Sequence, residues 1–121
     1  MKRIALTLAA ITLAIPAFAA DITGEWKRTD GKSRIRMAPC GGAICGTISW
    51  LRDSNSPAAH VGQRVFFDLK PSEGGWAGSA FNPEDGKTYD GKVTLSGAAM
   101  TTSGCVLGGL ICKSVNWTRA N

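Results

Sequence analysis

The sequence predicts an all-β protein, on the basis of three observations. No window between residues 20 and 121 keeps an apolar period of 3.6 over three turns. Short runs rich in β-branched and aromatic residues recur instead, separated by glycine-rich segments. Within these runs apolar and polar side chains alternate, as in strands with one buried face. Eight short strands at this spacing indicate a small eight-stranded antiparallel up-and-down barrel, or a small sandwich.

The predicted strands cover residues 22–28, 33–39, 43–52, 63–69, 76–82, 87–95, 98–106 and 111–119. Alternation defines the inward face of each strand. The third and fourth strands are expected to point Gly46, Ile48, Trp50, Val65, Phe67 and Leu69 inward. The sixth strand is expected to point Tyr89, Gly91, Val93 and Leu95 inward.

The stretch FNPEDGKTYDGKVTL, residues 81–95, concentrates carboxylates but fits a hairpin. Glu84 and Asp85 are adjacent, whereas a calcium loop needs carboxylates at alternate positions. Adjacent residues of an extended segment also point to opposite faces, which disfavours a pair of catalytic acids. Pro83 and Gly86 are typical turn residues, so we expect a turn here and no metal site.

The first nineteen residues have the features of a secretory signal peptide. Two basic residues precede an apolar run over residues 4–15, and Pro16 is followed by the small-x-small sequence AFA. The apolar run is shorter than the roughly 20 residues needed to cross a bilayer. We expect cleavage after Ala19 or Ala20, a single domain over residues 20–121, and a periplasmic or secreted protein that does not span the membrane.

Removal of this segment leaves 12 basic and 9 acidic residues, a formal charge of +3. This charge is too small to indicate a nucleic-acid-binding protein. Five basic residues cluster in the predicted 27–36 hairpin: Lys27, Arg28, Lys32, Arg34 and Arg36. This basic hairpin fits either a weak contact with anionic envelope surfaces or a solvated hairpin balanced by Glu25 and Asp30.

Four cysteines, Cys40, Cys45, Cys105 and Cys112, predict disulfides, because the signal peptide directs the chain to an oxidising compartment. A zinc site is not expected, since the spacings are C-x4-C and C-x6-C and the chain has one histidine. Three connectivities are possible. We favour Cys105 with Cys112, set opposite each other by the glycine pair of CVLGGLIC, and Cys40 with Cys45 across a four-residue loop.

The first and last predicted strands carry a matching pair of residues. Gly24 and Trp26 lie on the first strand and Arg119 lies on the last. In a closed barrel these strands are neighbours, so the guanidinium can close the barrel floor through cation–π and backbone-carbonyl contacts. Combined with eight strands, the G-x-W sequence points to the calycin group, which includes the lipocalins and streptavidin-like barrels.

Four segments carry a resemblance to a known family: GEWKRTDGKSRIRMAPCGGAICGTISWLRD, GWAGSAFNPEDGKTYDGKV, GCVLGGLIC and NWTR. Across Asp21 to Arg119 the chain resembles the domain of unknown function 2147 family of small exported bacterial proteins. The resemblance implies a small periplasmic or secreted antiparallel barrel of lipocalin-like or streptavidin-like form. It implies no established reaction and no catalytic residues. Phe81 stands where a tyrosine is expected, and the loop around His60 is least like the family pattern.

The function is left open between two main hypotheses. Inward aromatic side chains can line a site for a small apolar or amphipathic ligand. The candidates are Trp26, Trp50, Trp76, Tyr89 and Trp117. The same residues equally fit a filled core, which would leave a structural or interaction protein of the envelope. An enzyme is least supported, because His60 is the only histidine and no G-x-S-x-G sequence is present, so no catalytic residue, metal or cofactor is assigned.

The longest irregular stretch, residues 52–62, contains His60 and has no periodicity. We interpret it as a surface loop, either a flexible connector or a lid over a pocket.

Overall fold

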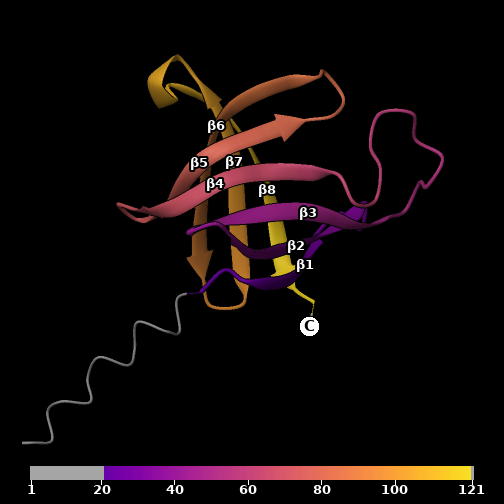
Figure 1. Cartoon of the computed structure of the whole chain (residues 1–121), viewed down its shortest axis with the longest axis horizontal. Coiled ribbons are helices and arrows are strands. Elements are labelled where there is room, and N and C mark those ends of the chain that lie inside the picture. Colours follow the sequence, from indigo (N-terminus) through magenta and orange to yellow (C-terminus); the bar gives the residue numbers. More distant parts are fainter. Residues whose placement is uncertain (1–20, 121) are drawn as a thin grey trace, which may run out of the picture.

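The structure, a computed structural model, describes residues 21–120 (Figure 1). Its eight strands are β1 (Gly24–Arg28), β2 (Ser33–Cys40), β3 (Ala43–Leu51), β4 (Arg64–Ser72), β5 (Gly75–Asn82), β6 (Lys87–Ser96), β7 (Ala99–Val106) and β8 (Ile111–Arg119). A short 3-10 turn, η2 (Leu107–Gly109), joins β7 to β8. The predicted strands are all present. The predicted signal peptide and its cleavage site lie outside the described residues.

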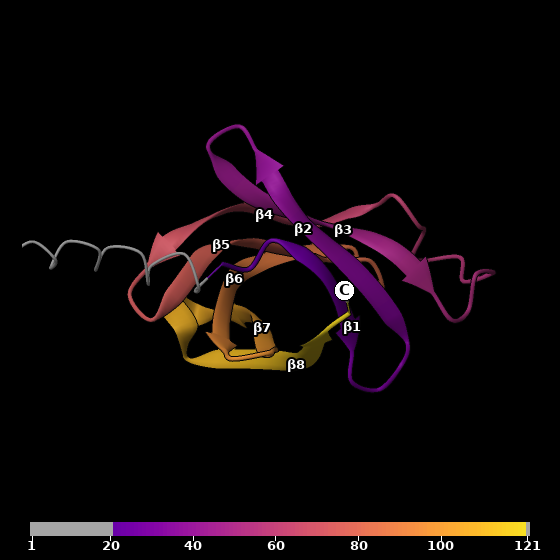
Figure 2. The same cartoon turned by 90° about the horizontal axis from the view of Figure 1, so that it is seen from below.

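Each strand pairs antiparallel with the next one along the chain, and β1 also pairs with β8 (Figure 2). The prediction of an all-β, eight-stranded up-and-down barrel is therefore confirmed, and closure pairs the first strand with the last. Within residues 21–120 no helix is long and apolar enough to cross a lipid bilayer.

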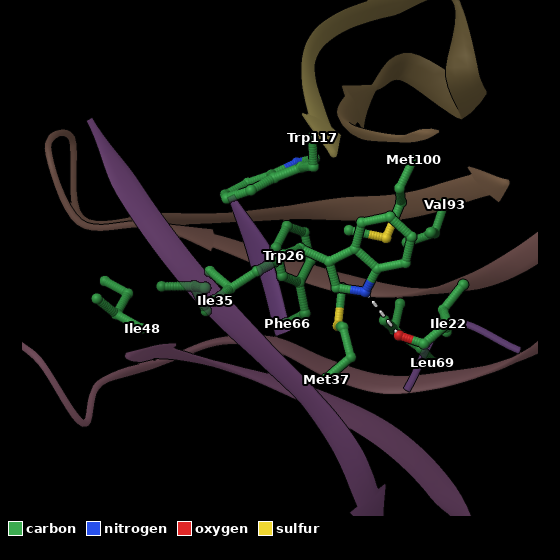
Figure 3. Close-up of a cluster of buried hydrophobic side chains, with 11 residues drawn as sticks. Ile22, Trp26, Ile35, Met37, Ile48, Phe66, Leu69, Val93, Met100 and Trp117 are labelled. Atoms are coloured by element: carbon green, nitrogen blue, oxygen red, sulfur yellow. Dashed lines mark hydrogen bonds between the residues drawn. The ribbon is translucent and has the colours of Figure 1, made fainter. Parts of the chain in front are cut away.

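The antiparallel order places the connections at two opposite ends of the barrel. The β1–β2, β3–β4, β5–β6 and β7–β8 connections lie at one end, which we call the open end. The other three connections and both ends of the described chain lie at the closed end. Fully buried side chains fill the closed end (Figure 3): Ile22, Trp26, Met37, Leu69, Val93 and Met100.

A β-bulge in the β2–β3 pair corrects one predicted position. The register steps from Arg34 opposite Trp50 to Ile35 opposite Ile48, which leaves Ser49 as an extra residue. Because one extra residue reverses the alternation, Trp50 points outward and is 44% exposed. The predicted inward position of Trp50 is therefore wrong.

Irregular pairing along β4 corrects a second position. Gly46 lies opposite Phe66 and Ile44 lies opposite Leu69, so β4 carries one residue more than β3 over this stretch. Asp68 supplies the irregularity with a left-handed backbone, φ 58°. Phe66 is buried as a result and Phe67 lies on the outer face, so the predicted inward position of Phe67 is wrong.

Both favoured disulfides are present, Cys40–Cys45 and Cys105–Cys112, which confirms the local pairing. Cys105 lies directly opposite Cys112, as expected. The β2–β3 turn is shorter than predicted, since Cys40 lies opposite Ala43 and the disulfide runs diagonally across the ladder. The two glycines between them both have positive φ, 64° and 86°, which a two-residue hairpin turn requires.

Candidate functional site

At the closed end of the barrel, Arg119 of β8 lies over Trp26 of β1, the strand with which β8 pairs. The guanidinium carbon of Arg119 lies 4.1 Å from the centre of the Trp26 ring. Its Nη1 donates to the Thr23 carbonyl at 2.7 Å and its Nη2 donates to the Asp21 carbonyl at 3.0 Å. These contacts are the cation–π and carbonyl contacts expected of the barrel floor.

Trp26 and Gly24 both form part of this floor. The Trp26 side chain is fully buried, and its Nε1 donates to the Ile22 carbonyl at 2.9 Å (Figure 3). Gly24 has φ 123°, and a Cβ at this position would lie 3.1 Å from Arg119 Nη1. Glycine is therefore required both by the backbone conformation and by the close approach of the guanidinium.

Above the floor, the open end of the barrel contains a cavity of about 770 Å³. Its inner wall is mostly apolar and is formed by Ile35, Ile48, Leu51, Val65, Phe66, Ala80, Val115 and Trp117. The volume lies within the roughly 300–1,000 Å³ typical of small-molecule sites. The barrel is therefore packed at one end and hollow at the other.

Few polar groups face the inner cavity. The indole Nε1 of Trp117 donates to the hydroxyl of Thr102 at 2.9 Å, and both side chains are buried. Ser33 adds one further buried hydroxyl to the lining. A charged group placed at this depth would lose its hydration with little compensation, so the inner cavity favours an apolar occupant.

Charged side chains lie around the mouth of the cavity. The basic residues are Arg28, Lys32, Arg52 and Lys113, and the acidic ones are Asp53, Glu84 and Asp85. Arg28 Nε lies 3.0 Å from Asp30 Oδ2, so its charge is balanced. Within residues 21–120 no carboxylate forms an ion pair with Lys32, Arg52 or Lys113. These three side chains supply positive charge at the mouth, beside the carboxylates of Asp53, Glu84 and Asp85.

The basic side chains of the 27–36 hairpin lie in different surroundings. Arg28 and Lys32 reach the cavity mouth. On the outer face, Arg36 Nη2 lies 3.1 Å from Glu25 Oε1. Two of the five predicted basic residues therefore have an acidic partner, and the contact of this hairpin with anionic envelope surfaces stays a prediction.

The β5–β6 turn at the mouth is fixed by its own side chains. The Tyr89 hydroxyl donates to one Asp85 oxygen, and the other oxygen accepts from the Lys87 backbone N–H at 2.9 Å. The hydrogen bond from Tyr89 lowers the pKa of Asp85 below its ordinary value. The same bond raises the pKa of Tyr89. Asp85 is thus a turn residue, in agreement with the predicted hairpin.

Of the five aromatic residues predicted to line a ligand site, two line the cavity, Tyr89 and Trp117. Trp26 lies below the cavity, in the floor. Trp76 packs against the core cluster without lining the cavity. Trp50 lies on the outer face, where the guanidinium of Arg34 stacks over its ring at 5.9 Å.

The sequence analysis missed several lining residues. Thr102 occupies the inward position of β7 between Met100 and Gly104, so its two-residue spacing from Met100 was an available signal. Phe66 was hidden by the irregularity in β4.

The 52–62 loop also contributes to the mouth through Arg52, Asp53, Ser56 and Ala59, whereas His60 is exposed and does not line the cavity. Over the described part of the chain, no three His, Cys, Asp or Glu residues are grouped to hold a metal ion.

A closed eight-stranded up-and-down barrel that is plugged at one end and hollow at the other defines a lipocalin-like calyx. Residues 24–119 match the family described as "uncharacterized protein conserved in bacteria (DUF2147)", and the chain belongs to this family.

A solved structure, protein HP1028 from the human pathogen Helicobacter pylori, is described as belonging to the lipocalin family. It is similar to this chain with a TM-score of 0.63 and 20% identity, over 84% of each chain. At this identity the similarity shows the fold. No curated protein matches the sequence.

Proposed function

We propose that this protein binds one small apolar or amphipathic molecule inside the open end of the barrel. The observation that carries the proposal is the cavity of about 770 Å³ above a floor that is already fully packed. A structural barrel of this size gains stability by filling its interior, because each unfilled volume forfeits packing contacts. An apolar chamber with few polar groups and one open end suits a ligand.

The lining also suggests how an amphipathic ligand lies in the barrel. Its apolar part contacts the deep wall around Ile48, Val65 and Trp117, where burial from water provides the driving force. Its polar end remains at the mouth, within reach of Lys32, Arg52 or Lys113. An anionic end group such as a carboxylate gains charge-assisted hydrogen bonds there.

We further propose that the protein acts outside the cytoplasm. Its four cysteines form two disulfides, which form and persist in oxidising compartments. The predicted signal peptide directs the chain to such a compartment.

The binding proposal is tested by titrating the purified protein with decanoate and with decanol, using calorimetry and native mass spectrometry. One molecule is expected to bind per chain, with decanoate favoured over decanol because of the basic side chains at the mouth. Binding of neither compound, nor of other acyl or small aromatic molecules, would contradict the proposal.

A matched pair of variants locates the site. Ala80 lines the cavity, so Ala80→Phe places a ring in the chamber. Ala99 is exposed at the closed end, so Ala99→Phe adds the same ring to the surface. Ala80→Phe should weaken binding at least about tenfold, and Ala99→Phe should leave it unchanged. Equal effects of the two variants would place the ligand elsewhere.

A further inference from the structure

The β7–β8 connection exposes a cluster of large apolar side chains to solvent. Val106, Leu107, Leu110 and Ile111 are 37, 67, 84 and 57% exposed. They surround a single turn, and we call these four residues the apolar tip. Clusters of exposed large apolar side chains mark surfaces that contact a protein or a membrane.

The apolar tip stands clear of the rest of the sheet. The β6–β7 pairing ends at Asp90 opposite Cys105, and the β1–β8 pairing ends at Arg28 opposite Trp117. Beyond these positions the β7–β8 hairpin has no strand beside it within residues 21–120, and it rises from the barrel at the top of Figure 1. The disulfide from Cys105 to Cys112 crosses the base of this projection.

A second hairpin shows that the fold does not require the apolar tip. The β2–β3 hairpin also extends past one neighbour, since the β1–β2 pairing ends at Met37 while β3 stays paired with β4 up to Ile44, and it is also crossed by a disulfide. Its turn has the sequence PCGGA over residues 39–43, with no large apolar side chain. A disulfide-linked hairpin with a glycine pair therefore forms without leucines.

Basic side chains flank the apolar tip. Lys113 directly follows Cys112, and Lys92 Nζ lies 3.5 Å from the point that a Cβ on Gly109 would occupy. The segment from Cys105 to Lys113 contains no acidic residue. The nearest acidic residues lie outside this segment: Glu84 and Asp85 in the β5–β6 turn, and the exposed Asp90 on β6 opposite Cys105. Exposed aliphatic side chains beside lysines complement an anionic lipid surface.

We propose that the apolar tip docks on anionic lipid bilayers. Leu107 and Leu110 enter the boundary between head groups and acyl chains, and Lys92 and Lys113 contact the head groups. Four aliphatic side chains on a narrow projection are too small for a stable protein interface, which buries about 800 Å² per partner. Docking also brings the cavity mouth to the membrane, because Val106 and Ile111 line the cavity as well. This inference does not require a ligand in the barrel.

The test is co-sedimentation with vesicles of phosphatidylcholine alone or mixed with phosphatidylglycerol. The purified protein should partition onto the mixed vesicles, with at least about tenfold weaker binding to phosphatidylcholine alone. The double variant Leu107→Asn and Leu110→Ser should reduce partitioning onto the mixed vesicles at least about tenfold. Asparagine tolerates the left-handed backbone at this position, φ 55°, so the turn is retained.

Two controls separate the tip from other effects. Phe67→Ser removes an exposed apolar side chain from the wall of β4, and it should bind vesicles as the unsubstituted protein does. Ala80→Phe fills the cavity and should also bind vesicles unchanged, so that a failure of ligand binding is distinguished from a failure of docking.

Three results would overturn the docking proposal. The first is an absence of binding to the mixed vesicles, and the second is equal binding by the double variant. The third is a concentration-dependent dimer in sedimentation velocity that the double variant abolishes, without vesicle binding, which would assign the apolar tip to a second copy of the chain.

Discussion

The two ends of the barrel use the same kinds of side chain for different purposes. At the closed end Trp26, Met37, Leu69 and Met100 are at most 1% exposed and belong to one buried cluster. At the open end Trp117 borders a cavity of about 770 Å³. The residues that stabilise the barrel and the residues available to a ligand are therefore separated along the barrel axis. The position of a tryptophan along the barrel axis therefore decides whether its ring stabilises the floor, as for Trp26, or borders the cavity, as for Trp117.

The largest expected effect is on stability at the closed end. Trp26→Ala should lower the free energy of unfolding by about 3–5 kcal/mol, because it leaves a large void in a packed floor and removes the ring beneath Arg119. Trp117→Ala should cost about 2 kcal/mol, since one side of that ring already faces the cavity. Urea denaturation measures both. Equal losses for the two variants would remove the distinction between the ends.

Gly24→Ala is expected to cost about 2 kcal/mol, because alanine is strained at φ 123° and its Cβ crowds Arg119. Gly86→Ala is the control, since Gly86 has φ 71° but no atom within 4 Å of its added Cβ. The difference between the two unfolding midpoints reports the guanidinium contact together with the different backbone strain of alanine at φ 123° and at φ 71°. A smaller loss for Gly24→Ala than for the control would contradict its role in closure.

One disulfide lies at each end of the barrel, Cys40–Cys45 at the closed end and Cys105–Cys112 at the open end. Replacing either cysteine pair with serine should lower the unfolding free energy by about 2 kcal/mol, because the two closed loops are similar in length. Only loss of the Cys105–Cys112 bond loosens the base of the apolar tip. Vesicle binding should therefore fall in that variant alone. Loss of vesicle binding in both variants would point to a global effect.

The smallest expected effect concerns the Tyr89–Asp85 hydrogen bond at the mouth. Tyr89 is the only tyrosine, so the alkaline change in absorbance reports its ionisation alone. Asp85→Asn should lower the pKa of Tyr89 towards its ordinary value of 10.0, because the carboxylate that raises it is removed. An unchanged titration midpoint would show that the hydrogen bond is absent in solution.

The same hydrogen bond predicts how stability varies with pH. Folding lowers the pKa of Asp85, so the bond stabilises the fold above the ordinary value of 3.8, and this contribution is lost as pH falls through the lower folded value. Folding raises the pKa of Tyr89, so the contribution also disappears as pH rises through that raised value. The unfolding midpoint of Asp85→Asn should vary less with pH in both ranges.

Features set by local chemistry could be predicted from the sequence. Strand alternation, glycine-rich turns and short cysteine spacings predicted the strand order and both disulfides, because each depends on residues close in the chain. The Trp26–Arg119 contact was also accessible, since closure of the barrel necessarily makes the first and last strands neighbours.

The cavity was harder to predict from the sequence. Single extra residues in β3 and β4 reverse the faces of Trp50 and Phe67, and no local signal marks them. Whether aromatic side chains fill or line a barrel depends on how all eight strands pack. The sequence alone therefore left the two possibilities open.

The most direct test of the difference between the ends is the indole N–H spectrum of the four tryptophans during titration with decanoate. The indole of Trp117 donates to Thr102 at the cavity wall, whereas that of Trp26 donates to Ile22 in the floor. We expect the Trp117 signal to shift and saturate while the Trp26 signal stays fixed. A spectrum in which no signal moves, or in which the Trp26 signal moves as far as that of Trp117, would contradict a hollow open end above a packed floor.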